Sequence, residues 1–526
     1  MRARPSSLAA LALTAAAGLV PAAGLAAGLT ARQAAGKRIY ATGESPSGAE
    51  ISALMAGDAT PVPATALPCA SCHGDDGLGR PEGAVLPSIV TWSELTRPGG
   101  HAHPGRSHGP FDARTVARAI EEGVDPAGQP LDAAMPRYSM PRADREALLA
   151  WLEVLERQSD PGLGPASIRV GTVLPERGPL AEVGRAMRTT LEAAFKEVNA
   201  AGGLNGRKLE LAVAGFGPER RAAMAALEKL AAARPLFALL ATFAPGAEVE
   251  LTAWAEQGRV PVVGPFTPFT RPVEAGASWT FYLQPGLAEQ GRVLVEHAAG
   301  QLGLANPRAV VLRPEGDPGF REAGEAALRQ AGARGWKDVE ARPIGPDGPG
   351  ADEVARLAGM GTEVVVFLGD DQALAGFLAA AQAAAWTPWV LAPGTLAARA
   401  AAAAPAAFEG RLRLSYPSLP DDETEAGRER LSRLGPAGAA AKHHAARVAA
   451  LGAATVLLEA LSRTGRQLSR ARLVATLEGL YQLQTGLSPP VSYGPRRRVG
   501  ALGGYVVAVD LGQRRFRPVG GWVRLD

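Results

Sequence analysis

Residues 69–73 read Cys-Ala-Ser-Cys-His, and this short run constrains the chain more than any other feature. The C-x-x-C-H spacing is that of a covalent attachment site for a c-type haem. On one helical turn, two thiols three positions apart can each form a thioether with a haem vinyl group, and the next residue can reach the iron. We therefore predict that Cys69 and Cys72 hold one haem c and that His73 is an axial iron ligand.

Other uses of the motif are weaker. A zinc site needs two more ligands at ordered spacing, and these are the only two cysteines in the chain. A thioredoxin-type C-x-x-C follows a strand of an α/β unit, whereas this one follows a loop rich in Pro, Ala and Thr. With both thiols bound to haem, no intrachain disulfide remains.

The N-terminus has the layout of a secretory signal peptide. Arg2 and Arg4 precede an uncharged apolar stretch that runs to about Ala27, with small residues at its end. An uncleaved membrane anchor is the alternative, but the stretch is rich in Ala and contains Pro21, which favours cleavage. We predict a signal peptide over 1–27 and a periplasmic protein, since c-type haem is attached outside the bacterial cytoplasm. No later segment is expected to span a membrane.

Length and charge set the remaining limits. A chain of 526 residues is too long for one ordinary core, which indicates two to four domains. With 47% apolar and 20% charged residues, the composition is that of a globular protein. The net charge of +3 is spread over the sequence in both signs, which gives no footprint for binding nucleic acid.

Residues 32–158 predict a helical first domain. Short helical patterns begin at 36–40, and Asp112 can cap a helix that ends near Glu122. The Pro- and Gly-rich stretch 81–110 is typical of a loop. A final helix is expected over 142–158, because its apolar residues recur at helical spacing.

Met135 and Met140 each precede a proline just before that last helix. A thioether sulfur is a soft iron ligand, and Met/His ligation raises the reduction potential of a haem. Together with the haem motif and the helices carrying Gly36 and Trp151, this region resembles the class I cytochrome c family. The resemblance implies a distal Met ligand, for which Met135 fits best and Met140 is the alternative. Packing near the haem edge would explain either residue equally simply.

Three histidines, His101, His103 and His108, lie in the Gly- and Pro-rich stretch. Such a group could bind a metal or supply another axial ligand. Residues 95–111, which hold these histidines, contain no Asp or Glu that would complete a metal site, and this favours a solvated loop.

After a linker at 159–166, strands and helices alternate from residue 167 to the end. Alternation of this kind predicts parallel sheets covered by helices on both faces. The pattern restarts after Phe281, which indicates two Rossmann-like α/β lobes. We place the first lobe at about 167–285 and 415–490, and the second at about 286–414 and 491–526.

This region resembles the type I periplasmic solute-binding proteins, the branched-chain amino acid receptor family of ABC importers. The similarity is carried by 168–174 as first strand, by the turn at 199–207, by 260–265 and by 281–285. The expected fold class is therefore multidomain: an all-α cytochrome c domain followed by a two-lobed α/β solute-binding domain.

In such folds the ligand lies at the carboxyl ends of the strands, between the lobes. The resemblance implies that hydroxyl groups and helix N-terminal amides hold a ligand carboxylate. The loop 243–246 departs from the receptors' small Ser-containing loop, which argues against an amino acid ligand. Turn formation and helix capping are the simpler explanation for each candidate side chain. The candidates are Thr242 and Thr267 as hydroxyl donors, Phe266 as cleft lining, and Asp317 and Asp370 from the second lobe.

These features favour a periplasmic one-electron carrier fused to a module that binds a small molecule. The expected partners are that solute, a periplasmic redox partner and an ABC permease. One alternative is an ABC-transporter receptor with an accessory cytochrome; another is a haem sensor or a peroxidase-like enzyme. The last needs an open iron position, which the Met-Pro sequences disfavour. No catalytic residue is assigned, and the chain is expected not to be an enzyme.

Overall fold

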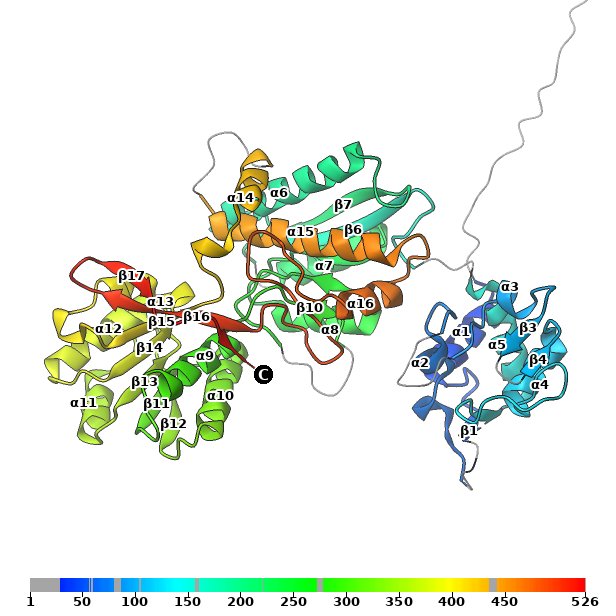
Figure 1. Cartoon of the computed structure of the whole chain (residues 1–526), viewed down its shortest axis with the longest axis horizontal. Helices are drawn as coiled ribbons and strands as arrows, with labels where there is room; N and C mark the ends of the chain where they lie inside the picture. Colours follow the sequence, from blue (N-terminus) through cyan, green and yellow to red (C-terminus); the bar gives the residue numbers. More distant parts are fainter. Residues whose placement is uncertain are drawn as a thin grey trace, which may run out of the picture. The chain divides into compact units, whose positions relative to one another are not determined.

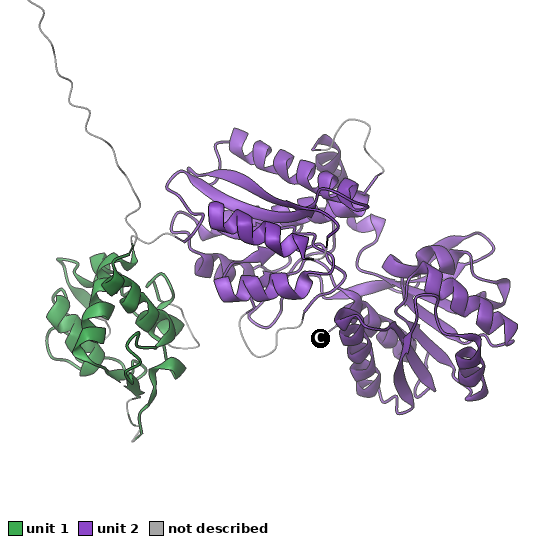
Figure 2. Ribbon diagram, turned by 180° about the vertical axis from the view of Figure 1, so that it is seen from behind, with its two compact units in different colours: residues 1–158 green, residues 159–526 purple. Residues whose placement is uncertain are grey.

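The computed structural model describes residues 29–525 except 56, 58–59, 80–86, 104–105, 157–159, 220, 272–277 and 435–441. The predicted signal peptide, 1–27, lies outside the described residues. The chain forms two compact units, residues 1–158 and 159–526, which Figure 2 distinguishes by colour. Each is described by itself below.

Helices form most of the first unit (Figure 1). Thr30 caps the first helix and Asp112 caps the fourth, where its carboxylate accepts a hydrogen bond of 2.7 Å from the Thr115 amide. A capping side chain satisfies an amide that the helix itself cannot pair. The fourth helix begins at the predicted cap, whereas the first begins at Ala31, five residues before the predicted start at Gly36. The helices are α1 (Ala31–Thr42), α2 (Cys69–His73), α3 (Trp92–Leu95), α4 (Ala113–Glu121) and α5 (Arg142–Leu155).

Short strands, which the sequence did not predict, join these helices. Because strands of two or three residues give no readable alternation, their pairing becomes visible only in the fold. The strands β1 (Ser52–Leu54), β2 (Val62–Pro63) and β5 (Arg137–Ser139) form one antiparallel sheet in the order β2-β1-β5. The stretch expected as loop contains α3 and an antiparallel hairpin of β3 (His101–His103) and β4 (Arg106–His108).

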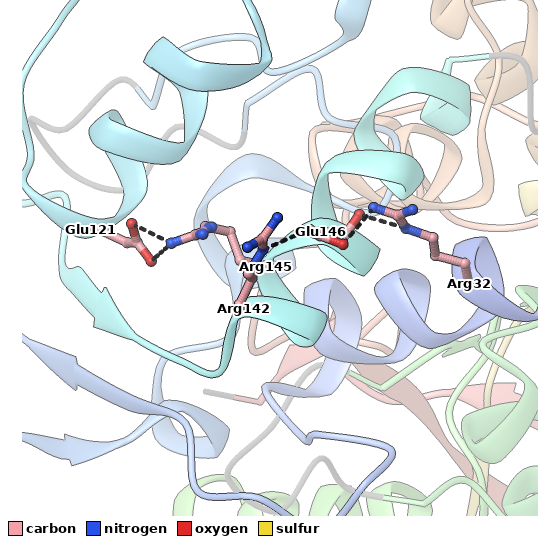
Figure 3. Close-up of polar contacts among 5 residues, drawn as sticks. All are labelled: Arg32, Glu121, Arg142, Arg145 and Glu146. Atoms are coloured by element: carbon pink, nitrogen blue, oxygen red, sulfur yellow. Dashed lines mark hydrogen bonds and ion pairs between the residues drawn. The ribbon is translucent and has the colours of Figure 1, made fainter.

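The apolar faces of α1 and α5 pack together in the core of this unit. Outside the core, ion pairs connect three helices: Arg32 on α1 with Glu146 on α5 at 3.1 Å, and Arg145 on α5 with Glu121 on α4 at 2.7 Å (Figure 3). These side chains are partly or largely exposed, so each pair contributes at most about 1 kcal/mol. Burial of the apolar faces is the larger stabilising term.

The second unit begins with a five-stranded parallel sheet in the order β10-β9-β8-β6-β7. Helices cover both faces, as expected: α6, α15 and α16 contribute to one core cluster, and α7 and α8 to another. The strands are β6 (Ser167–Pro175), β7 (Lys208–Phe216), β8 (Ala238–Leu240), β9 (Val262–Val263) and β10 (Thr280–Phe281). The helices are α6 (Ala181–Ala200), α7 (Ala222–Ala233), α8 (Glu248–Gly258), α14 (Glu425–Arg433), α15 (His444–Thr464) and α16 (Arg470–Glu478).

The second lobe has a mixed sheet in the order β12-β11-β13-β14-β15-β16-β17, with β18 beside β16. Its first five strands in this order are parallel, whereas β16, β17 and β18 pair antiparallel. A short turn after Asp510 joins β16 to β17, and such a turn can only join antiparallel neighbours. The strands are β11 (Ala309–Pro314), β12 (Val339–Ile344), β13 (Val364–Phe367), β14 (Trp389–Pro393), β15 (Leu412–Tyr416), β16 (Gly503–Asp510), β17 (Arg515–Pro518) and β18 (Val523–Arg524). The helices are α9 (Leu287–Gly300), α10 (Pro318–Ala333), α11 (Ala351–Gly359), α12 (Asp371–Ala383) and α13 (Gly394–Ala402).

Two features of the second unit differ from the sequence analysis. Helix α15 has the length and hydropathy of a membrane span, so the prediction that no later segment reaches them was wrong for this helix. Within its most apolar window 67% is buried inside the protein, as in a core helix. Val491 and Tyr493 pack in the core cluster of the first lobe, although we placed residue 491 onward in the second lobe.

Candidate functional site

The haem motif lies on the wall of a cavity of about 560 Å³ in the first unit. Helix α2 places Cys69, Cys72 and His73 on this wall. A haem also needs apolar surroundings for its ring. Side chains from α3, α4, α5 and the loops between them provide these surroundings. These apolar lining residues include Leu95, Val116, Ile120, Leu131, Leu148 and Leu152.

His73 is held in one orientation. Its Nδ1 lies 2.8 Å from the carbonyl oxygen of Ser88 and donates the hydrogen bond, which leaves the Nε2 lone pair available to a metal. Burial lowers the pKa of His73, so the ring is neutral, as a ligand must be. A hydrogen bond on the second nitrogen is the usual way to fix a metal-binding histidine.

Two tyrosine hydroxyls fix the chain on either side of the motif. Tyr40 donates to the carbonyl oxygen of Gly74 at 2.7 Å, and Tyr138 donates to that of Leu67 at 2.6 Å. Burial raises the pKa of the Cys69 thiol to about 12. A thiol–disulfide centre needs the opposite shift, so the surroundings of Cys69 do not suit redox chemistry at sulfur.

Of the two candidate methionines, Met135 lines the cavity, whereas Met140 packs against the same core without being one of the described residues on the cavity wall. The backbone at Met135 is held from both ends. Its amide donates to the carbonyl oxygen of Asp132 at 3.1 Å, and its carbonyl oxygen accepts from the guanidinium of Arg137.

The hairpin of β3 and β4 also reaches this cavity, which the interpretation as a solvated loop missed. His101, Arg106 and His108 line it, and the two imidazole rings lie 5.0 Å apart. His101 Nε2 lies 2.9 Å from the carbonyl oxygen of Glu94, and Arg106 lies 3.9 Å from the buried carboxylate of Asp125. In the described part of the chain, no group of three or more His, Cys, Asp or Glu side chains is arranged to hold a metal ion.

Taken together, the donor atoms fit a haem c. Two cysteine sulfurs and an oriented imidazole lie on one wall, a thioether is available on the lining, and apolar side chains fill the rest. The haem would be held by Cys69 and Cys72, with His73 and Met135 as iron ligands.

A second, much smaller cavity of about 20 Å³ lies in the second unit at the carboxyl end of β8. Thr242, Phe266 and Thr267, three of the predicted binding residues, line it. Strand order reverses between β6 and β8, and a crevice at such a reversal is where open α/β sheets bind ligands. The chain enters the site through Ala241, whose φ of +45° is a strained conformation for a residue with a Cβ.

Three of the predicted side chains, Thr267, Asp317 and Asp370, have local structural partners. Thr267 Oγ1 accepts a hydrogen bond of 3.0 Å from the Phe269 amide. Asp317 caps α10 by accepting from Gly319 at 2.7 Å, and Asp370 caps α12 by accepting from Ala373 at 3.0 Å. Capping is the simpler explanation that the sequence left open for both aspartates.

Three residues that line the small cavity were not singled out from the sequence: Glu248, which ends the candidate loop 242–248, and Thr280 and Tyr282, which lie outside the candidate loops. Glu248 could have been found from its place in the sequence, because an acidic residue opens the helix that follows the loop after β8. Thr280 and Tyr282 belong to the short β10 region, which shows no pattern of its own.

Comparison with known proteins confirms both family resemblances. The periplasmic binding protein family matches residues 167–513, and the cytochrome c family matches residues 63–156. No curated protein sequence matches the chain.

Solved structures with a similar fold include three ABC-transporter receptors. A fatty acid ABC transporter substrate-binding protein from Thermomonospora curvata has 16% identity and a TM-score of 0.53, over 70% of this chain and 95% of that one. A branched-chain amino acid ABC transporter protein from Thermus thermophilus with bound valine has 17% identity and a TM-score of 0.53, over 69% and 97%. A leucine-binding protein from Thermotoga maritima has 16% identity and a TM-score of 0.52, over 68% and 98%. At these identities the likeness concerns the fold.

Proposed function

The chain belongs to the periplasmic binding protein family and carries a cytochrome c domain ahead of that module, and on this basis we propose that it is a one-electron carrier coupled in one polypeptide to solute binding. One observation supports the redox half above all. A single apolar cavity is lined by Cys69, Cys72, His73 and Met135.

Haem c supplies exchange of one electron at its iron, and the protein's residues determine how. Cys69 and Cys72 would attach the group, the Ser88 carbonyl orients His73 to bind its iron, and Met135 would supply the second iron ligand. The apolar lining would keep water away from the group. If His73 and Met135 both bind the iron, no position would be left for a substrate, so we propose no catalytic residue and no bond-making step.

In the second unit, a small molecule would bind between the lobes next to Thr242 and Phe266. The family match favours a second candidate function for the same unit, that of an ABC-transporter receptor that delivers its solute to a permease. Both functions place the protein in the periplasm after removal of residues 1–27, where a redox partner would exchange electrons with the haem.

Visible spectra of protein made with c-haem maturation test the redox half. The oxidised protein should show the weak long-wavelength band of methionine–iron ligation. Met135→Ala should abolish the band, lower the reduction potential and let carbon monoxide bind the reduced iron. Met140→Ala is the matched control and should leave all three unchanged.

Two results would contradict this assignment. Loss of the band in Met140→Ala alone would make Met140 the ligand. A high-spin spectrum in the unaltered protein, with ready binding of carbon monoxide, would favour the haem sensor or peroxidase-like alternative over electron transfer.

Native mass spectrometry of the purified holoprotein tests the solute-binding half. A bound solute should appear as an added mass that is lost when the protein is denatured. A solute-binding role fails if the folded holoprotein carries no added mass beyond haem and no compound of a metabolite panel raises its melting temperature.

A further inference from the structure

Glu248 lines the small cavity at the start of a helix. It is the first residue of α8, and Ala247 before it supplies no side-chain cap. The backbone amides of Gly246 and Glu248 act on its carboxylate and lower its pKa, although burial raises that pKa overall. Exposed amides at a helix N-terminus would otherwise attract a ligand's carboxylate. Here the Glu248 carboxylate lies where the carboxylate of a ligand would otherwise bind.

Asp317, at the start of α10, adds a second negative charge near Glu248. Burial is the main cause that raises the pKa of Glu248, and the negative charges of Asp317 and Glu250 raise it further. Asp317 is brought near because α10 docks on the loop after β9: the rings of Phe269 and Phe320 lie 5.3 Å apart, edge to face.

The basic side chain close to this loop is already paired. Arg271 forms an ion pair of 3.5 Å with Glu322 on α10, and its charge also acts on Tyr282 of the cavity wall. The cavity wall carries one acidic side chain, Glu248, and the charge of Asp317 acts on it from outside the wall. A positively charged solute would relieve the repulsion between these two carboxylates.

The rest of the lining suits a cation with an apolar body. Phe266, Phe269 and Tyr282 line the cavity, and Phe243 packs on Phe266 with ring centroids 5.2 Å apart. Aromatic faces attract cations, most strongly where water is excluded.

An unused hydrogen-bonding group lies in the same wall. Thr280 is 1% exposed, and its hydroxyl has no hydrogen-bond partner among the described residues. A buried hydroxyl without a partner is costly, so a group that occupies the cavity and bonds to it is favoured. The hydroxyl oxygen of Thr280 can accept a hydrogen bond from an N–H group of a bound solute.

We propose that the module selects an organic ammonium solute, with the protonated amine at Glu248 and Thr280 and an apolar or aromatic group against Phe266. This inference rests on the proposed solute-binding function and names its ligand class. It also excludes solutes that would place a carboxylate at the start of α8, because Glu248 would repel it.

Isothermal titration of the full holoprotein with two matched probes tests the proposal. The probes are 2-phenylethylamine and 3-phenylpropionate, which carry the same ring on a short chain and opposite charges. The amine should bind at least about tenfold more tightly than the acid. Glu248→Gln should weaken amine binding by about tenfold or more, whereas Glu250→Gln, an exposed change in the same helical turn, should alter it by less than about twofold.

Thr280→Val, which keeps the side-chain shape but removes the hydroxyl, gives an independent variant if Glu248→Gln fails to fold; it should also weaken amine binding. Tighter binding of the acid, equal effects of the Glu248 and Glu250 changes, or no binding of either probe would each overturn the proposal. The added mass in native spectrometry is read separately, so the solute-binding function can stand when the ligand class fails.

Discussion

His297 is a buried titratable residue with no hydrogen-bond partner among the described residues for either ring nitrogen. It lies on α9 and is 2% exposed. Burial, and the nearby charge of Arg413, lower its pKa to about 4. The folded state therefore binds the proton less well than the unfolded state, whose histidine titrates near 6.5. The stability that follows is complete above about pH 6.5 and is lost as the pH falls toward about 4.

Replacing His297 should remove this pH dependence. We expect the unfolding free energy of the unaltered second unit to fall by about 3 kcal/mol more than that of His297→Leu between about pH 7.5 and about pH 4. Denaturant titrations at the two pH values measure this difference. His444→Gln changes a largely exposed histidine and serves as control. Equal losses in His297→Leu and the unaltered protein would show that another group carries the effect.

For single residues, the sequence predicts the chemical role of a side chain better than it predicts which residues surround that side chain in the fold. The C-x-x-C-H motif and the Asp112 cap follow from local spacing, which a sequence displays directly. Glu248 and His101 gain their roles from contacts with elements distant in the chain. The position of Glu248 at a helix start gives a hint of its role, but the sequence near His101 does not indicate the cavity wall on which the fold places that residue.

Among the elements, the crossing of α1 and α5 depends on one residue without a side chain. A Cβ on Gly36 would lie 1.9 Å from the carbonyl oxygen of Ala147 and 2.8 Å from the Cβ of Trp151. The two helices can approach this closely only because Gly36 has no Cβ.

Gly36→Ala should therefore force the helices apart. We expect the first unit to lose about 1–3 kcal/mol of stability, the usual cost of overpacking a core. Melting of the holoprotein, followed at the haem absorbance, measures the loss. Gly99→Ala is the control in the same unit, since a Cβ there meets no heavy atom within 4 Å. Similar melting of the two variants would mean that the helices tolerate a wider crossing.

The elements most easily predicted were those with long apolar periodicity, such as β6 and α6. The sequence did not predict the short paired strands or α16. One buried arginine fixes the position of α16. Arg470 donates to the carbonyl oxygens of Leu236, Phe237 and Gly258. Such long-range pairing of a cation with backbone oxygens has no local sequence signal, so α16 could not be located from its pattern.

For the whole molecule, the two units have separate apolar cores. One core cluster contains residues of the first unit only, whereas the others draw all their members from the second. Because each core is complete within its unit, a change in one core lowers the stability of that unit through lost contacts of its own.

Calorimetry of the holoprotein should consequently resolve two transitions. Met135→Ala should shift only the transition temperature that coincides with the change in haem absorbance. Lowering the pH should shift the transition temperature of the second unit, and His297→Leu should suppress that shift. Each variant thus changes the stability of one core and identifies the transition that belongs to it. If either variant displaced both transitions by the same amount, the units would unfold as one cooperative body, and haem ligation would then stabilise the solute-binding unit as well. Separate responses would instead mean that any influence of solute on the haem acts between two independently stable folds.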